Sequence, residues 1–331
     1  MTSLSVAVTV REAYGFAIRG FVRNLAVVWL PVVLTAALVI LSLPPLLGGL
    51  AHFLSGLSGP HPDALALAAG GAVFMRYTLL IAVGGLFFRA QIMTGLTQRA
   101  LGQRTGFAGV YLSFGASFWR VFGAYVLIFL LLMAVQLAAS LLLVLPTIIL
   151  VGISHGAAGG GAIPQAGIAF VAFFILWRIA LLVLVTYLFI RLTFVVTAVI
   201  VAEQRFDLIR AWQLVGGNVL RILAVGLVVF VPLVLVLAAL YGLLLGPELW
   251  TLVHSLAHTS MHGRRLAAAL IQDIVGGVTQ LLARRWFVLL PLALISVTLE
   301  YGLAAGAGVA GYRSLVSEGD GEGAAHISTT V

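Results

Sequence analysis

Among the charged side chains inside the long apolar stretches of this 331-residue chain, three stand out as candidates for chemistry. Arg89 and Arg191 interrupt two of these stretches, and Glu300 lies about halfway along the last one. An arginine at the centre of an isolated membrane span costs about 2.5–3.5 kcal/mol on insertion scales. Three roles are available to these residues. The arginines can snorkel to lipid headgroups, Glu300 can form a structural ion pair with Arg89 or Arg191, or the charges can line a path for a substrate or ion.

A second pattern joins an aromatic residue to an arginine nine positions later, directly before an apolar stretch. It occurs three times, as Tyr14/Arg23, Tyr111/Arg120 and Trp212/Arg221. This pattern suits the binding of lipid headgroups, because the ring can lie at the membrane boundary and the guanidinium can form bidentate hydrogen bonds with phosphate. The simpler alternative is that each pair only anchors an amphipathic helix on the membrane.

Three histidines, His254, His258 and His262, repeat at intervals of four residues. Two histidines at this spacing on a helix can share one metal ion, but the third has turned about 80° round the helix from the first. The alternative is that they are ordinary polar residues at a membrane interface. We assign no metal and expect no cofactor.

The composition identifies a membrane protein. The chain is 62% hydrophobic and 8% charged, whereas soluble domains carry about 25% charged residues. All 18 basic residues are arginines, and there is no cysteine, which excludes disulfides and thiol chemistry. A net charge of +8 would suggest nucleic acid as a partner of a soluble protein. Here the arginines flank apolar stretches, so anionic membrane lipid is the expected partner and nucleic acid is not.

Six membrane spans are predicted, at about 25–48, 66–97, 121–145, 167–201, 220–245 and 286–311. Because backbone groups exposed to lipid must be paired within helices, an all-α transmembrane bundle with six helices follows. The second and fourth spans are so long that they reach about 50 Å as helices, against a hydrocarbon core of about 30 Å. These two spans must tilt, break or protrude into water.

The connections between the spans differ in charge. The segments 5–24, 98–120 and 202–219 are basic and amphipathic, whereas 49–65 and 152–166 are rich in glycine and proline and have no arginine. The positive-inside rule places the basic connections and both termini in the cytoplasm. The segment 246–285 disagrees, because it falls outside yet holds four arginines. Its second half, 266–283, has the pattern of an interfacial helix, and a re-entrant segment is the alternative.

An internal repeat is visible in the arginines. Arg76, Arg89, Arg104 and Arg120 match Arg178, Arg191, Arg205 and Arg221 at offsets of 101 or 102 residues. We interpret this as two parallel two-helix repeats, at about 66–146 and 167–247. They belong to a single polytopic membrane domain, 1–316. The polar segment 317–331 lacks apolar periodicity and is predicted to be a disordered tail.

Catalytic motifs are absent from the sequence. The chain has no phosphate-binding glycine loop, no nucleophile elbow and no HExxH motif. The sequence therefore gives no support for an enzyme.

Residues 187–223 resemble a known bacterial membrane domain. The matching residues are Tyr187 to Leu192, Glu203, Arg210 to Leu214, Gly216 to Asn218, Arg221 to Leu223 and, near the end, Tyr312 to Leu315. This pattern is similar to the membrane domain fused to some bacterial glycerophosphoryl diester phosphodiesterases, and to its stand-alone uncharacterised relatives. Ala211 and Val215 depart from the serine and threonine typical of that family. The resemblance implies a six-helix integral domain without the catalytic barrel.

Together these features predict a multi-pass protein of the bacterial inner membrane with cytoplasmic termini. The favoured function is that of a non-enzymatic accessory or scaffold protein of the envelope, which engages anionic lipid or a membrane partner. The alternative is a transporter or channel with a polar site near Arg89, Arg191 and Glu300.

Overall fold

The computed structural model describes residues 4–57, 63–104, 111–112, 114–156, 163–258 and 266–327. Within them the chain forms helices and no strand. The elements are α1 (Val6–Tyr14), a π-helical turn η1 (Gly15–Arg19), α2 (Phe21–Leu57), α3 (Ala64–Ala100), α4 (Ala116–Gly156), α5 (Ile163–Thr193), α6 (Val196–Glu203), α7 (Leu208–Val215), α8 (Val219–His258) and α9 (Leu266–Ile327). The predicted all-α fold class is confirmed.

In the described ranges, six segments are long and apolar enough to cross a membrane. They are Phe21–Gly56, Ala64–Ala100, Ala116–Leu143, Ala172–Glu203, Val219–Pro247 and Arg284–Val316. Each overlaps one of the six predicted spans. The protein is therefore a multi-pass membrane protein.

The two overlong spans behave differently. α3 is one helix of 37 residues, about 55 Å long, so it extends beyond a hydrocarbon core of about 30 Å. The fourth span instead breaks between α5 and α6, after Thr193. The hydroxyl of Thr193 donates to the carbonyl of Phe189 at 2.7 Å, a side-chain bond of the kind that bends helices.

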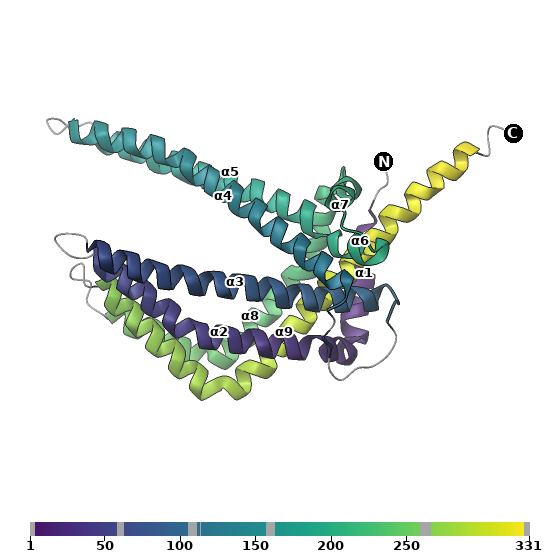
Figure 1. Cartoon of the computed structure of the whole chain (residues 1–331), viewed down its shortest axis with the longest axis horizontal. Coiled ribbons are helices and arrows are strands. Elements are labelled where there is room, and N and C mark those ends of the chain that lie inside the picture. Colours follow the sequence, from purple (N-terminus) through teal and green to yellow (C-terminus); the bar gives the residue numbers. More distant parts are fainter. Residues whose placement is uncertain are drawn as a thin grey trace.

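The long helices form two arms that meet at one end of the molecule (Figure 1). One arm pairs α4 with α5, and the other contains α2, α3, α8 and most of α9. The end where they meet, here called the junction end, is formed by residues 4–20, 196–218 and 302–315. α1 and the C-terminal part of α9 both lie there, so the two ends of the described chain are on the same side, as the charge pattern predicts.

α9 runs through the middle of the junction end, and its glycines let other elements approach closely. A Cβ atom on Gly306 would lie 3.0 Å from Ala13 Cα, and one on Gly308 would lie 2.8 Å from the carbonyl oxygen of Phe194. Ala13 belongs to α1, and Phe194 belongs to the link between α5 and α6. Small residues allow helix backbones to pack this closely in membranes, so α9 joins the first element of the chain to the fourth span.

α6 is a core helix and not a surface element. Its residues from Val196 to Val201 are all buried, and it packs against α3, α4 and α9. A helix that is apolar all round is expected in an interior. α6 therefore links the α4–α5 arm to the other arm at the junction end.

The segment predicted as an interfacial helix, 266–283, is helical and continuous with the last span as part of α9. α9 bends sharply between this segment and the junction end (Figure 1). Pro291 lies in this helix, and a proline inside a helix removes one backbone hydrogen bond and kinks it.

α9 continues in helical conformation to Ile327, and the disorder predicted for 317–331 stays a prediction. Residues 328–331 lie outside the described ranges. The sequence after Val316 has no proline, and no described glycine beyond that point has a positive φ. Proline and a left-handed glycine, two usual helix terminators, are therefore absent from the described part of this segment.

Adding one methyl group to Gly306 or Gly308 should loosen the junction end. We expect Gly306→Ala and Gly308→Ala each to lower stability by about 1–3 kcal/mol, because a Cβ atom overpacks the contact. Thermal unfolding in detergent measures the effect. The control is Gly85→Ala on α3, where a Cβ atom meets nothing within 4 Å, and where stability should hold or rise. Equal midpoints for all three variants would contradict this packing.

Candidate functional site

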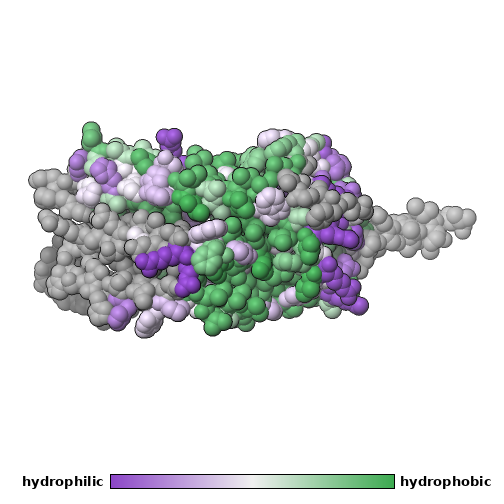
Figure 2. Space-filling model, turned by 90° about the horizontal axis from the view of Figure 1, so that it is seen from below, coloured by the Kyte–Doolittle hydropathy of each residue, from purple (hydrophilic) through white to green (hydrophobic). Residues whose placement is uncertain are grey.

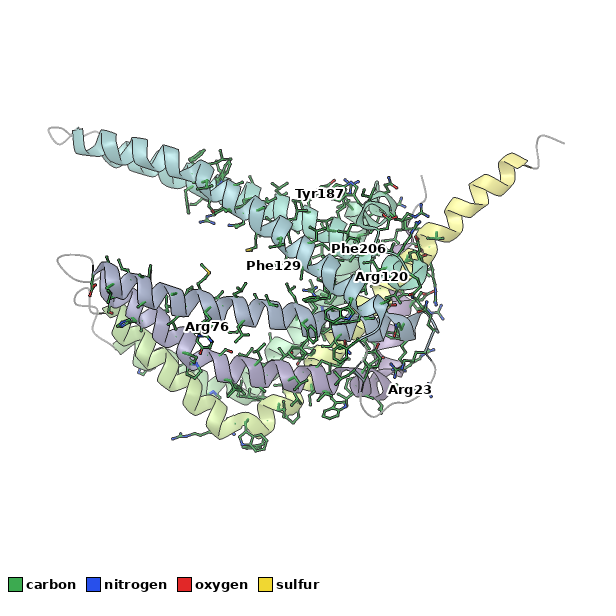
Figure 3. The ribbon with its side chains drawn as sticks, in the orientation of Figure 1. Arg23, Arg76, Arg120, Phe129, Tyr187 and Phe206 are labelled. Atoms are coloured by element: carbon green, nitrogen blue, oxygen red, sulfur yellow. The ribbon has the colours of Figure 1, made fainter. Side chains whose placement is uncertain are left out.

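Ten arginines lie at the junction end or at the helix ends that reach it. They are Arg11, Arg19, Arg23, Arg99, Arg104, Arg120, Arg205, Arg210, Arg221 and Arg313. Figure 2 shows a broad apolar surface over the middle of the molecule, with hydrophilic side chains beyond it at this end. Figure 3 places Arg23 and Arg120 there, and Arg76 far along α3 towards the opposite end. One end of the membrane protein is therefore strongly basic.

Only part of this positive charge is neutralised. Glu203, whose side chain is 18% exposed, contacts Arg205 at 2.6 Å and Arg210 at 3.7 Å. It also accepts a hydrogen bond from the Tyr312 hydroxyl at 3.4 Å. Asp207 lies 3.5 Å from Arg205. The other eight arginines of the junction end form no ion pair with any side chain that the structure describes.

Two of these eight arginines are fixed by neutral oxygens. Arg99 donates to the side chain of the buried Asn24 at 2.8 Å, and Asn24 in turn donates to the carbonyl of Phe16 at 3.1 Å. Arg313 donates to the carbonyl of Ala100 at 3.0 Å, at the end of α3. Cations are favoured at the C-terminus of a helix. These bonds position both arginines and leave their charges uncancelled.

The rings of the three aromatic–arginine pairs turn towards protein. Tyr111 is 2% exposed and donates to Gln98 at 3.0 Å. The hydroxyl of Tyr14 donates to the carbonyl of Val229 in α8 at 3.1 Å. Both tyrosines thus connect one segment of the structure to another through their hydroxyl groups.

The arginines of the three pairs are more accessible than their rings. Arg23 and Arg221 are exposed. Arg120 is half-buried and donates to the side chain of Gln204 at 3.5 Å. Any headgroup contact of the three pairs would therefore come from the guanidinium groups.

Arg191 has a partner that the sequence patterns did not indicate. Its guanidinium lies 3.8 Å from the centre of the Trp212 ring and donates to the Tyr187 hydroxyl at 2.6 Å. The two rings meet edge to face at 6.5 Å. Arginine over tryptophan is a favourable cation–π arrangement. It ties the end of α5 to α7.

The three charges predicted inside the spans do not come together. No ion pair joins Glu300 to Arg89 or Arg191 among the described side chains, so the structure gives no support to the ion pair among the three roles considered for these charges. Glu300 is exposed on α9, and Arg191 is held by Trp212. Arg89 lies between the two arms, with its guanidinium 5.4 Å from the centre of the Tyr125 ring. Each charge is therefore accommodated separately.

A second group of arginines lies farther from the junction end. Arg76 and Arg178 are exposed, and each lies over a neighbouring ring, Tyr77 at 5.7 Å and Phe174 at 5.0 Å. Along α3, Arg76 and Arg99 are separated by about 35 Å, close to the thickness of the hydrocarbon core of about 30 Å. Arginines paired with aromatic rings are typical of the membrane interface. Arg76 thus fits the boundary opposite the junction end.

The predicted histidine cluster can be followed only in part. His254 is exposed, and its ring stacks on Trp250 at 6.3 Å. The side chain of His258 and the whole of His262 lie outside the described residues. Among the side chains that are described, no group of three histidine, cysteine, aspartate or glutamate residues is placed to hold a metal ion.

Comparisons with known proteins return no family model, no curated protein and no solved structure that matches this chain.

Arg191 and Trp212 should be energetically coupled through their contact. In a double-mutant cycle of Arg191→Gln and Trp212→Ala, we expect a coupling of about 0.5–2 kcal/mol from stability measurements in detergent. The control cycle pairs Arg178→Gln with Trp212→Ala, because Arg178 lies on the same helix but over Phe174. If the two cycles gave the same coupling, the stacking would have no energetic role.

Proposed function

We propose that the protein is a non-enzymatic accessory or scaffold protein of the bacterial inner membrane, whose basic end engages anionic lipid or a membrane partner. The observation that carries the proposal is the set of eight arginines at the junction end without an ion pair in the described structure. Charges that no described side chain cancels attract counter-charges, and anionic headgroups are a source of them at a membrane surface.

The same charge pattern favours a cytoplasmic junction end. Arginine-rich connections remain on the cytoplasmic side during insertion, and the inner leaflet there presents anionic headgroups. Each arginine near such a surface contributes about 1 kcal/mol of attraction. The exposed Arg23 and Arg221, with the half-buried Arg120, are the residues we assign to headgroup contact.

The resemblance to the membrane domain of glycerophosphoryl diester phosphodiesterases supports an integral membrane role and no hydrolytic one. It covers the segments around Arg191, Trp212 and Arg221. In the structure Arg191 and Trp212 join α5 to α7, and Arg221 is exposed at the start of α8, so the first part of the matched pattern is one of helix packing. We therefore assign no catalytic residue.

The alternative function, a transporter or channel, was motivated by a shared polar site at Arg89, Arg191 and Glu300. Arg89 lines a pocket between α3, α4 and α5, whereas neither Arg191 nor Glu300 lines it. Because Arg191 and Glu300 do not share the pocket of Arg89, we favour the lipid-binding proposal.

Removing the three accessible charges tests the proposal. We expect the variant R23Q/R120Q/R221Q to lower the preference for phosphatidylglycerol over phosphatidylcholine by about fivefold or more, because each arginine contributes about 1 kcal/mol. Spin-labelled lipids in nanodiscs measure this preference.

The control is R76Q/R178Q/R284Q, which removes three exposed arginines away from the junction end and should change the preference less. If the junction-end variant folded normally and kept its lipid preference, the proposal would fail.

A further inference from the structure

A pocket of about 100 Å³ lies between the two arms of the bundle. Leu86 and Arg89 of α3 line it on one side, Tyr125 and Phe129 of α4 on another, and Phe189 and Thr193 of α5 complete it. Figure 3 shows Phe129 on the side of α4 that faces α3, where the arms diverge. A single water needs roughly 10–15 Å³ of such space, so the pocket has room for a carboxylate or phosphate group.

Arg89 supplies the positive charge of this pocket. Its Nε atom is buried and has no hydrogen-bond partner in the described structure. The guanidinium lies over the Tyr125 ring at 5.4 Å, and the hydroxyl of Tyr125 is itself hydrogen-bonded to Thr197 at 2.8 Å. Tyr125 is therefore fixed in place, and its ring and hydroxyl both interact with Arg89 without bringing a negative charge.

Arg89 lies at a depth in the membrane where an unpaired charge is costly. Arg89 and Arg99 are ten residues apart on one helix, about 15 Å along α3. Arg89 is thus well below the basic end, about halfway across a hydrocarbon core of about 30 Å. An arginine at such depth costs about 2.5–3.5 kcal/mol on insertion scales, and a bound anion would lower that cost.

The walls of the pocket indicate what kind of anion fits. Apart from Arg89, Tyr125 and Thr193, the lining side chains are apolar. A small hydrophilic anion would lose its hydration here without compensation. An anion attached to an acyl chain would place its head on Arg89 and its methylene groups against Leu86, Phe129 and Phe189.

We propose that the pocket between α3, α4 and α5 binds the anionic headgroup of an acyl lipid, with Arg89 as its counter-ion. The lipid enters sideways from the bilayer, between the two arms. The headgroup is the carboxylate of a fatty acid or the phosphate of a phospholipid, since both join an anion to an acyl chain. This site is separate from the surface formed by Arg23, Arg120 and Arg221 and does not depend on it.

Equilibrium binding of radiolabelled oleate and of radiolabelled phosphatidylglycerol to the purified full chain in neutral detergent tests the proposal. We expect saturable binding of at least one of them, and the ligand that binds identifies the headgroup. R89Q should weaken it at least tenfold, and R89K should retain part of it. The matched control, R76Q, removes an exposed arginine from the same helix and should leave binding unchanged.

A second variant separates binding from folding. Leu132→Trp narrows the pocket from a half-buried lining position and keeps the charge of Arg89, so it should also weaken binding. R23Q/R120Q/R221Q should leave this binding intact even if it changes the general lipid preference. The proposal is overturned if neither ligand binds saturably, if R89Q and L132W both bind like the unaltered chain, or if R76Q loses binding as much as R89Q.

Discussion

Close packing around the glycines of α9 is the constraint on which the rest of the structure depends. Burying apolar side chains against each other gains little inside a bilayer, because lipid is equally apolar. Helices must instead approach closely or exchange hydrogen bonds. Gly306 and Gly308 let α1 and the α5–α6 link reach the backbone of α9. This contact brings the starts and ends of distant spans together and so concentrates the arginines at one end.

The arginines of the protein lie in several different environments. At the junction end, Glu203 and Asp207 pair with Arg205 and Arg210. Neutral oxygens hold Arg99 and Arg313, and Arg23 and Arg221 remain exposed. Below that end, Arg191 stacks on Trp212 while Arg89 faces a pocket. Arg89 and Arg191, which the predicted repeat places at matching positions, thus have different surroundings. The first points into the space between the arms, and the second fastens α7 to α5.

Local patterns predicted the spans and the basic end well, because the lengths of apolar runs and the positions of arginines are local properties. The contacts between side chains of different helices could not be predicted in this way. Arg191 and Trp212 lie on different helices, and the pocket at Arg89 needs side chains from three helices. Asn24 gave a signal, a polar residue at the start of an apolar stretch, but its bond to Arg99 depends on how α2 meets α3. The ion pair considered as one role of Glu300 is not formed among the described side chains, and Glu300 lies exposed on α9.

The side of the membrane on which the junction end lies is the most direct test, since the proposed engagement of anionic lipid requires the cytoplasmic side. The chain has no cysteine, so single cysteines can be labelled without background. Phe206→Cys reports on the junction end, where Phe206 is 49% exposed, and Ser55→Cys reports on the opposite end of α2. With a membrane-impermeant maleimide on intact cells whose outer membrane has been opened, we predict labelling of the cysteine at 55 only, and labelling at 206 after the inner membrane is disrupted. Labelling at 206 in intact cells would contradict the account.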